Sequence, residues 1–542
     1  MKFLPSGGQW VWTLLLAPWI LFPIQAQPPT DAAFLSTLGE LREASYSEKE
    51  TIAERLSKTG HPSVRAVLTG FMEDRLCFRN SDRKVFLVKS NEGDSLNLAD
   101  PLTLKDAGFA SADSLTKIGT NNGLRHVLRT TIAHFALSSP DVSVRMEAVR
   151  EMQQSLDEPT VALLRERSGV ETNPGVKNEI ATGLALASLD GSDPNARLEA
   201  VATLGKSVSQ VVRNRLALLL ENESDAKVRR AAAAAVATID QWRTFYSAIE
   251  TLFFGLSLGS VLVLIAIGLA ITFGVMGVIN MAHGELMMLG AYTTYAVQTA
   301  MPGHIGLSVL VAIPAAFLVS GSTGVLLERT IIRFLYGRPL ETLLATFGVS
   351  LFLQQSVRSI FSALNRSVVT PEWMSGSLRL NDALTITYNR LYIVIFTLLV
   401  FSLILAVLKR TRIGLDIRAV SQNRAMAKAM GIRTEWVDAM TFGLGSGIAG
   451  VAGVALSQLT NVGPNLGQSY IIDSFMVVVF GGVGNLWGSL IGGMSMGVLN
   501  KLLEPYAGAV LAKIFVLVAL ILFIQARPRG LFPQAGRAAE DK

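Results

Sequence analysis

Hydrophobic and polar residues are distributed along this chain in two different ways, and the change falls near Glu250. Before it, apolar residues recur at the three- and four-residue spacing of helices that bury one face. After it, long apolar segments follow one another, as in a chain that crosses a membrane repeatedly. We expect nine of them: residues 252–273, 286–299, 307–327, 343–361, 391–408, 441–459, 471–483, 490–502 and 509–524. Several are shorter than the roughly 20 residues that span a bilayer, which predicts broken or re-entrant helices.

The polar half contains four similar phrases, which predict stacked helices. They are DVSVRMEAV (141–149), PGVKNEIA (174–181), DPNARLEAV (193–201) and DAKVRRAAA (225–233). In most of them an Asp precedes the helix as an N-cap, and a base follows at Arg145, Lys177, Arg197 or Arg229. The alternating spacing of these bases is typical of helical pairs packed side by side, and the pattern resembles HEAT-type repeats. We expect a helical-repeat domain over residues 27–245, most often a docking surface.

Residues 76–110 differ from the helical phrases around them, and residues 85–89 are rich in β-branched and aromatic residues, as in a short strand. We interpret them as a small insertion in an otherwise all-α protein. The histidines of this half, His61, His126 and His134, lack metal-ligand spacing, so the sequence predicts no metal site and no catalytic centre here.

The first residues are typical of an export signal. Lys2 is followed by an apolar run over residues 10–22, and Pro23 and Ala26 end it. We expect residues 1–26 to be a signal peptide, with an uncleaved anchor as the alternative. The single cysteine, Cys77, cannot form an intrachain disulfide, so it neither supports nor contradicts export.

The distribution of basic residues predicts how the chain is oriented in the membrane. The chain is 50% hydrophobic with mean hydropathy +0.41, and its pI of 9.3 comes mainly from basic loops in the membrane half rather than from a nucleic-acid site. Positive loops face the cytoplasm. We therefore place inside the cell three groups: Arg329, Arg333 and Arg338; Lys409, Arg410, Arg412, Arg418, Arg424, Lys428 and Arg433; and Arg527, Arg529 and Arg537. This puts the N-terminal domain in the periplasm and the tail, 533–542, in the cytoplasm.

An ionisable pair lies in the most apolar region. Residues 251–327 contain no Lys, Arg or Asp and one Glu, and that Glu285 lies beside His283 in NMAHGELMMLGA (280–291). Ionisable residues at membrane depth usually face a bundle interior or a water-filled path. The alternative is that residues 276–285 form a loop with both side chains solvated at the surface.

Two further features accompany the apolar segments. Glycines crowd residues 443–453 and 481–497, and because no Lys-Ser/Thr follows them, close helix packing is favoured over a phosphate loop. Residues 409–440 are basic and too long for a plain connection. Within them we expect a short helix over 423–430, a C-cap at Gly431 and an N-cap at Thr434. This segment predicts a docking element for a soluble partner, with a lipid-binding loop as the alternative.

These residues carry a family resemblance. NMAHGELMMLGA, the Ala-rich, Gly-terminated segment within 411–455, and the terminal RPRGLF (527–532) resemble permeases of the branched-chain amino-acid ABC importers. The similarity covers about 251–532. The glutamate of that family's coupling loop is not evident, because Asn423 and Arg424 stand in its region. An exported repeat domain before the permease resembles the urea importer branch.

The resemblance implies an ATP-driven importer in the bacterial inner membrane. It implies a second permease subunit, cytoplasmic ATP-binding subunits that use the ATP, a periplasmic solute-binding protein and surrounding lipid, but no nucleic acid and no cofactor in this chain. Urea is the expected solute, with branched-chain amino acids or short amides as alternatives. The solute-pathway candidates are Asn280, His283, Gly284, Glu285 and Gln354, and the ATPase-coupling candidates are Arg424, Ala425, Ala429, Gly431 and Ile432.

Two other classes of protein stay open on the residues alone. A channel or secondary transporter could use His283 and Glu285 as a proton relay. An intramembrane enzyme could use the same pair, but His283 and Glu285 lack the second histidine of an HExxH helix. No Walker motif occurs either, so we expect a non-enzymatic transport subunit.

Overall fold

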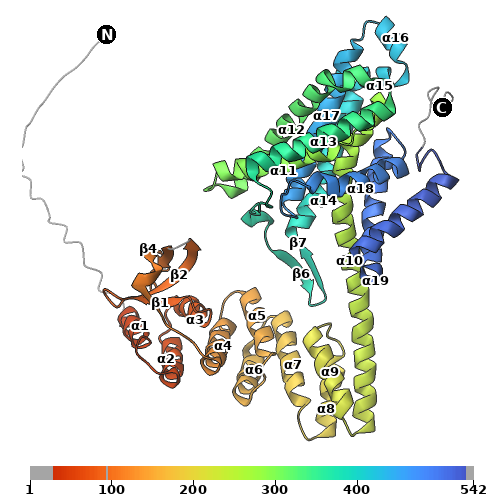
Figure 1. The fold of residues 1–542 in the computed structure, drawn as a ribbon. Helices are drawn as coiled ribbons and strands as arrows, with labels where there is room; N and C mark the ends of the chain where they lie inside the picture. The colour runs from red at the N-terminus through yellow and green to blue at the C-terminus, as the bar shows by residue number, and fades with distance from the viewer. Residues whose placement is uncertain (1–28, 93–94, 533–542) are drawn as a thin grey trace, which may run out of the picture. The chain divides into compact units, whose positions relative to one another are not determined.

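The computed structural model describes residues 29–92 and 95–532, and they form two compact units (Figure 1). The first comprises the residues up to 207 together with 214–236, and the second comprises 208–213 and the residues from 237 onward. The predicted signal peptide and cytoplasmic tail (533–542) lie outside the described residues.

The first unit begins with three helices and a sheet. The helices are α1 (Pro29–Glu40), α2 (Tyr46–Lys58) and α3 (Val64–Met72). Five antiparallel strands follow in the order β4-β3-β2-β1-β5, and the short 3₁₀ helix η1 (Ala112–Ser114) precedes β5. Their bounds are β1 Leu76–Arg79, β2 Val85–Glu92, β3 Ser95–Ala99, β4 Asp106–Ser111 and β5 Leu115–Lys117.

This sheet corrects the all-α prediction. The strand expected at 85–89 is part of β2, but the sequence indicated only one strand where five pair. One face of the sheet is covered: Leu76, Val85 and Leu87 join the same buried cluster as Phe34 and Phe71 from the helices. The insertion is therefore part of the core of this unit rather than an appendage.

The remaining helices of this half repeat with a fixed period. They are α4 (Asn122–Leu137), α5 (Val142–Met152), α6 (Glu158–Val170), α7 (Pro174–Ser188), α8 (Pro194–Leu204), α9 (Gln210–Asn222) and α10 (Ala226–Met276). Helices α4, α7 and α10 begin at 122, 174 and 226, α5 and α8 at 142 and 194, and α6 and α9 at 158 and 210, each 52 residues after its counterpart. The repeated phrases thus mark a three-helix period.

The predicted N-caps of these helices are confirmed. The side chains of Asp141 and Asp193 accept hydrogen bonds from backbone amides of the first turns of α5 and α8, and Asn173, which was not predicted, does so for α7. Asp225 does the same for the amides of Lys227 and Val228. An N-cap acceptor satisfies amides that the helix itself leaves unpaired.

Two of the repeated bases have equivalent buried partners. Arg145 forms two hydrogen bonds with Glu171, both 3.0 Å long, and donates to the carbonyl oxygen of Ser139. Fifty-two residues later, Arg197 pairs with Glu223 at 2.8 and 3.0 Å and donates to the carbonyl of Gly191. Both guanidinium groups therefore tie a short helix to the residues that precede the long helix of the next repeat.

The second unit contains helices that match the nine apolar segments. After α10 come α11 (His283–Ala300), α12 (Ile305–Thr330), η2 (Ile332–Leu335), α13 (Pro339–Phe361), η3 (Glu372–Met374), α14 (Tyr388–Arg410), α15 (Arg412–Gln422), α16 (Arg424–Ala429), α17 (Thr434–Ser457), α18 (Leu466–Gly481) and α19 (Leu486–Ala526). Strands β6 (Ser377–Asn381) and β7 (Leu384–Thr387) form a hairpin before α14.

Five of the described helices are long and apolar enough to cross a membrane: α10, α12, α14, α17 and α19. Helix α18 is apolar but shorter, as expected for a broken or re-entrant element. Helix α19 contains the last two predicted segments, and its helical geometry is interrupted at Gly508, where φ is 76° and ψ is 163°. Pro505 lies one turn before this break.

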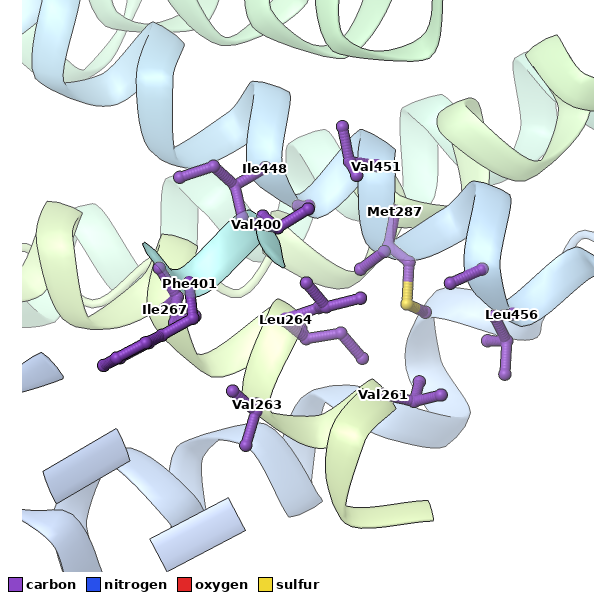
Figure 2. Packing of buried hydrophobic residues seen from close by; sticks show 14 of the residues in the cluster. Val261, Val263, Leu264, Ile267, Met287, Val400, Phe401, Ile448, Val451 and Leu456 are labelled. Atoms are coloured by element: carbon purple, nitrogen blue, oxygen red, sulfur yellow. The ribbon is translucent and has the colours of Figure 1, made fainter. Parts of the chain in front are cut away.

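The core of the second unit forms where α10, α11, α14 and α17 meet. Figure 2 shows Leu264 of α10, Met287 of α11, Val400 of α14 and Val451 of α17 within one buried cluster. A neighbouring cluster joins α10 with α18 and α19. Helix α10 contributes to both clusters and so lies at the centre of this packing.

We predict that the Arg197–Glu223 pair stabilises its repeat in a pH-dependent way. Arg197→Ala leaves the buried Glu223 carboxylate without its cation, and removing one partner of a buried pair costs about 3–5 kcal/mol. The Arg197 hydrogen bond holds the pKa of Glu223 below its ordinary value. The stabilisation is therefore present above about pH 4.3 and is lost as the pH falls through the lowered folded-state pKa.

The measurement is amide hydrogen exchange of α8 and α9 in the full-length chain, between pH 7 and the lowest pH at which it stays soluble. Asp190→Asn is the control, because it removes an exposed pair with Arg215 and such pairs contribute about 0–1 kcal/mol. Equal protection from hydrogen exchange in both variants at pH 7 would show that the buried pair stabilises the repeat no more than the exposed pair does.

Candidate functional site

The site is positioned by glycines that let α11 and α17 touch backbone to backbone. A β-carbon added at Gly290 of α11 would lie 2.1 Å from the carbonyl oxygen of Gly450, and one added at Gly453 would lie 2.1 Å from that of Met287. Real β-carbons do not approach so closely, so neither position has room for a larger residue. This confirms that the glycines of 443–453 serve close helix packing.

Other glycines fix both ends of this arrangement. Gly445 of α17 meets Gly268 of α10, and Gly447 meets Phe317 of α12. At the start of α11, Gly284 lies against Gly467 of α18, with a β-carbon position 2.5 Å from the Gly467 carbonyl oxygen. The first turn of α11 is thereby held between α10 and α18.

His283 is completely buried and braces α11 against α10. Its Nε2 lies 3.1 Å from the carbonyl oxygen of Ile265, which can only accept, so Nε2 carries the proton. Nδ1 has no hydrogen-bond partner among the described residues. The ring lies next to Gly268, where a β-carbon would be 2.9 Å from it. This geometry is that of a neutral imidazole connecting two helices.

Glu285 is buried as well and connects α11 with α13. Its Oε1 accepts hydrogen bonds from Gln354 Nε2 at 2.7 Å and from Ser350 Oγ at 3.0 Å, while Oε2 has no partner among the described residues. His283 and Glu285 are 0% and 1% exposed. The alternative of a solvated surface loop is therefore wrong, although residues 277–282 do connect two helices.

The loop before α11 is also tied to α13. Asn280 is buried, its Oδ1 accepts from the amide of Ala282, and its Nδ2 has no partner among the described residues. The amide of Met281 donates to Thr346 Oγ1 at 3.1 Å. The structure thus brings together four neighbouring candidates, Asn280 to Glu285, with Gln354 from 69 positions later.

Sequence reasoning missed the rest of the polar face of α13. Thr342, Thr346, Ser350 and Gln354 recur at every fourth position and are all buried. Polar residues at this spacing lie on one side of a helix. This four-residue spacing could have identified the polar face from the sequence. The neighbouring Gln355 lies on the exposed side of the helix.

The coupling candidates lie on and after α16. Ala425, Ala429 and Gly431 are exposed, and Ile432 is partly buried. Asn423 caps α16 through the amide of Met426, and the φ of 88° at Gly431 matches the predicted C-terminal glycine. Thr434 is not an N-cap: it is the first residue of α17.

Arg424, the first ATPase-coupling candidate, forms contacts within the chain. Its guanidinium donates to both carboxylate oxygens of the buried Asp438 in α17, with Nη1 3.0 Å from Oδ1. The same guanidinium lies 4.1 Å from the ring centre of Tyr336, on the connection between α12 and α13. Arg424 is therefore committed to contacts within the chain.

A bundle of closely packed, partly broken apolar helices, with a short exposed helix on a basic loop, defines a polytopic membrane protein. The particular family follows from comparison: the chain belongs to the family of branched-chain amino acid transport system permease components, whose model matches residues 251–525. Members are transporter components of the ABC class rather than enzymes.

Individual relatives support this membership. The chain is 31% identical to the branched-chain amino acid permease BraD of Pseudomonas aeruginosa, over 53% of this chain and 96% of the relative. It is 32% identical to LivH of Salmonella typhimurium, over 52% and 94%. A probable LivH of Methanocaldococcus jannaschii is 25% identical over 50% and 88%. No solved structure is significantly similar to the chain.

We predict that Gly290→Ala prevents stable packing of α11 against α17. Its β-carbon would meet the Gly450 backbone, and overpacking typically costs about 1–3 kcal/mol or more where the backbone must shift. Gly348→Ala is the matched control, because a β-carbon there has no neighbour within 4 Å and Ala favours a helix by up to about 1 kcal/mol. The measurement is the thermal stability of each purified variant in detergent. A Gly290→Ala protein as stable as Gly348→Ala would contradict the close contact.

A second prediction concerns the role of Glu285. Glu285→Gln keeps a carbonyl oxygen that accepts from Ser350 and Gln354, whereas Glu285→Ala removes this acceptor. Gln354 then keeps only its 3.3 Å bond to Ser350 Oγ, and a buried donor left unpaired costs about 1–3 kcal/mol. We expect ATP-driven uptake by Glu285→Gln within about threefold of wild type, and a much larger loss for Glu285→Ala. If the Gln variant is stable but as inactive as the Ala variant, the charge itself is required and a proton relay gains support.

Proposed function

We propose that this chain is a permease subunit of an ATP-driven importer that carries urea across the bacterial inner membrane. A second permease completes the solute pathway, a periplasmic binding protein delivers the solute, and cytoplasmic ATPases supply the energy. The observation that carries the proposal is the coupling segment. Met426 of its short helix α16 and Met430 directly after that helix are 60% and 78% exposed, among basic residues of a long loop in a permease of this family.

The positive-inside rule supports the orientation. With α16 in the cytoplasm, the other basic groups, at Arg329–Arg338 and Arg527–Arg529, also lie inside, and the first unit lies in the periplasm. Its repeating, stacked helices suit a helical-repeat docking domain, although the repeat is of three helices rather than the pairs expected, and we propose that a signal peptide at residues 1–26 exports it. We infer that this domain receives the binding protein or another periplasmic partner.

Urea is favoured by two observations. The branched-chain amino acid relatives are matched over 94–96% of their length by about half of this chain, so they have no counterpart to its N-terminal domain. The buried polar groups around Glu285 are hydroxyls, amides, an imidazole and a carboxylate, and none of the buried polar residues described in the second unit is Lys or Arg. Such a lining suits a neutral solute with amide donors and a carbonyl acceptor better than one with a carboxylate.

Branched-chain amino acids are the second candidate, because the relatives named above carry them in their names. Short amides share the hydrogen-bonding groups of urea. A secondary transporter or channel is disfavoured by the exposed coupling helix, which such a protein does not need. In this assignment the subunit has no ATPase activity of its own.

We predict ATP-dependent uptake of urea by the assembled importer in proteoliposomes. The two permeases, the ATPases and the binding protein are reconstituted together, and labelled urea, leucine and acetamide are compared at equal concentration. We expect urea uptake to exceed leucine uptake at least about tenfold, a preference of about 1.4 kcal/mol, and to stop without ATP.

Three results would contradict the proposal in different ways. If leucine is taken up in preference to urea, the solute is a branched-chain amino acid, the second candidate. Uptake by this chain without its ATPases would indicate a channel or secondary transporter. ATP hydrolysis by the purified chain alone would overturn its assignment as a permease subunit.

A further inference from the structure

The coupling helix α16 is attached to the membrane unit by a charge pair between the partly exposed Arg424 and the buried Asp438. Both carboxylate oxygens of Asp438 accept from Arg424, and the side chain of Asp438 is only 4% exposed. Paired hydrogen bonds of this kind fix direction as well as distance. The ring of Tyr336 covers the guanidinium from another connection, so α16 is held to α17 and to the α12–α13 link at once.

Apolar contacts support the same attachment. Ala427, which faces inward from α16, shares a buried cluster with Val437 of α17 and with Ile417 and Val420 of α15. The opposite side of α16 is exposed at Met426 and Lys428, as is Met430 directly after the helix. One side of this helix is therefore anchored, and the other is free for a partner.

Helix α17 leads from this anchor to the buried site. Its 24 residues span about 36 Å at 1.5 Å per residue, and Asp438 lies in its second turn. Further along, Gly450 and Gly453 touch the backbone of α11 without any intervening side chain. Close-packed backbones cannot slide past one another without a clash, so displacement of α17 moves α11 with it.

Helix α13 is attached to α11 differently. Polar contacts connect them: Glu285 with Ser350 and Gln354, and Thr346 with the amide of Met281. Hydrogen bonds can exchange partners where interlocked backbones cannot. Movement of α11 with α17 therefore acts first on the bonds of Glu285.

We propose that Asp438 is a positioning residue that holds Arg424 and α16 rigidly to α17, so that movement of the docked ATPases reaches the Glu285 hydrogen bonds. The inference rests on the proposed function, because it requires ATPases that act on α16. It adds the route of coupling, α16 to α17 to α11, and it assigns Arg424 to that route rather than to the ATPase surface.

The test uses the fully assembled importer with Asp438→Asn. We expect the ATPases to remain bound and to hydrolyse ATP, while uptake falls about tenfold or more, as is typical when one partner of a buried charge pair is neutralised. Exchanging the charges, Arg424→Asp with Asp438→Arg, should restore at least about half of the uptake if the pair itself matters.

Glu435→Gln is the matched control. Glu435 is an acid three residues earlier on α17, but its side chain is 62% exposed and lies 3.7 Å from Arg333. We expect solute uptake by the Glu435→Gln importer to stay within about twofold of wild type, because exposed charge pairs contribute little. Equal losses in Glu435→Gln and Asp438→Asn would overturn the proposal, because a general charge effect would then explain both.

Arg424→Lys covers the case in which Asp438→Asn does not fold. It keeps the charge but loses the paired geometry, and it should lower uptake at unchanged ATPase binding. Wild-type uptake by Arg424→Lys, or by a folded Asp438→Asn, overturns the positioning role. An inactive wild-type importer would instead contradict the proposed function, so the two failures are distinguishable.

Discussion

The membrane unit depends on the backbone contact between α11 and α17. At Gly290, which faces the backbone of Gly450, and at Gly453, which faces the backbone of Met287, the two helices approach so closely that no β-carbon fits between them. In a bilayer, where lipid is as apolar as a leucine side chain, such close packing replaces the hydrophobic effect as the force between helices. The contact places the first turn of α11, and with it His283 and Glu285, inside the protein rather than at its surface.

His283 and Glu285 can be buried only if their polar groups form hydrogen bonds inside the protein. His283 donates to a backbone carbonyl of α10, and Glu285 accepts from two side chains of α13. Neither residue needs an ionised partner to stay buried. The same two residues therefore connect α10, α11 and α13 through hydrogen bonds alone. Helix α13 is thus attached to α11 by polar contacts and not by interlocked backbones.

Local patterns in the sequence predicted much of this architecture. The features that were not predicted depend on contacts between residues far apart in the chain. Apolar segments, N-cap residues and the glycine clusters each depend on neighbouring positions, and helices were found at all nine segments. The sheet was missed except for one strand, because strands such as β4 are largely exposed and carry no strong alternation. Ser350 and Asp438 were missed because their partners lie 65 and 14 positions away. The repeated bases were noticed, but their carboxylates, 26 positions later, were not.

The single cysteine gives this chain a useful chemical property. Cys77 lies in strand β1, is 4% exposed, and burial raises the pKa of its thiol to about 11. A thiol reacts as the thiolate, so at neutral pH the natural chain is nearly inert toward maleimides and other thiol reagents. Any cysteine introduced on an exposed helix therefore becomes the dominant reactive site without prior removal of a native one. Labels and cross-linkers can thus be directed to chosen helices in an otherwise natural protein.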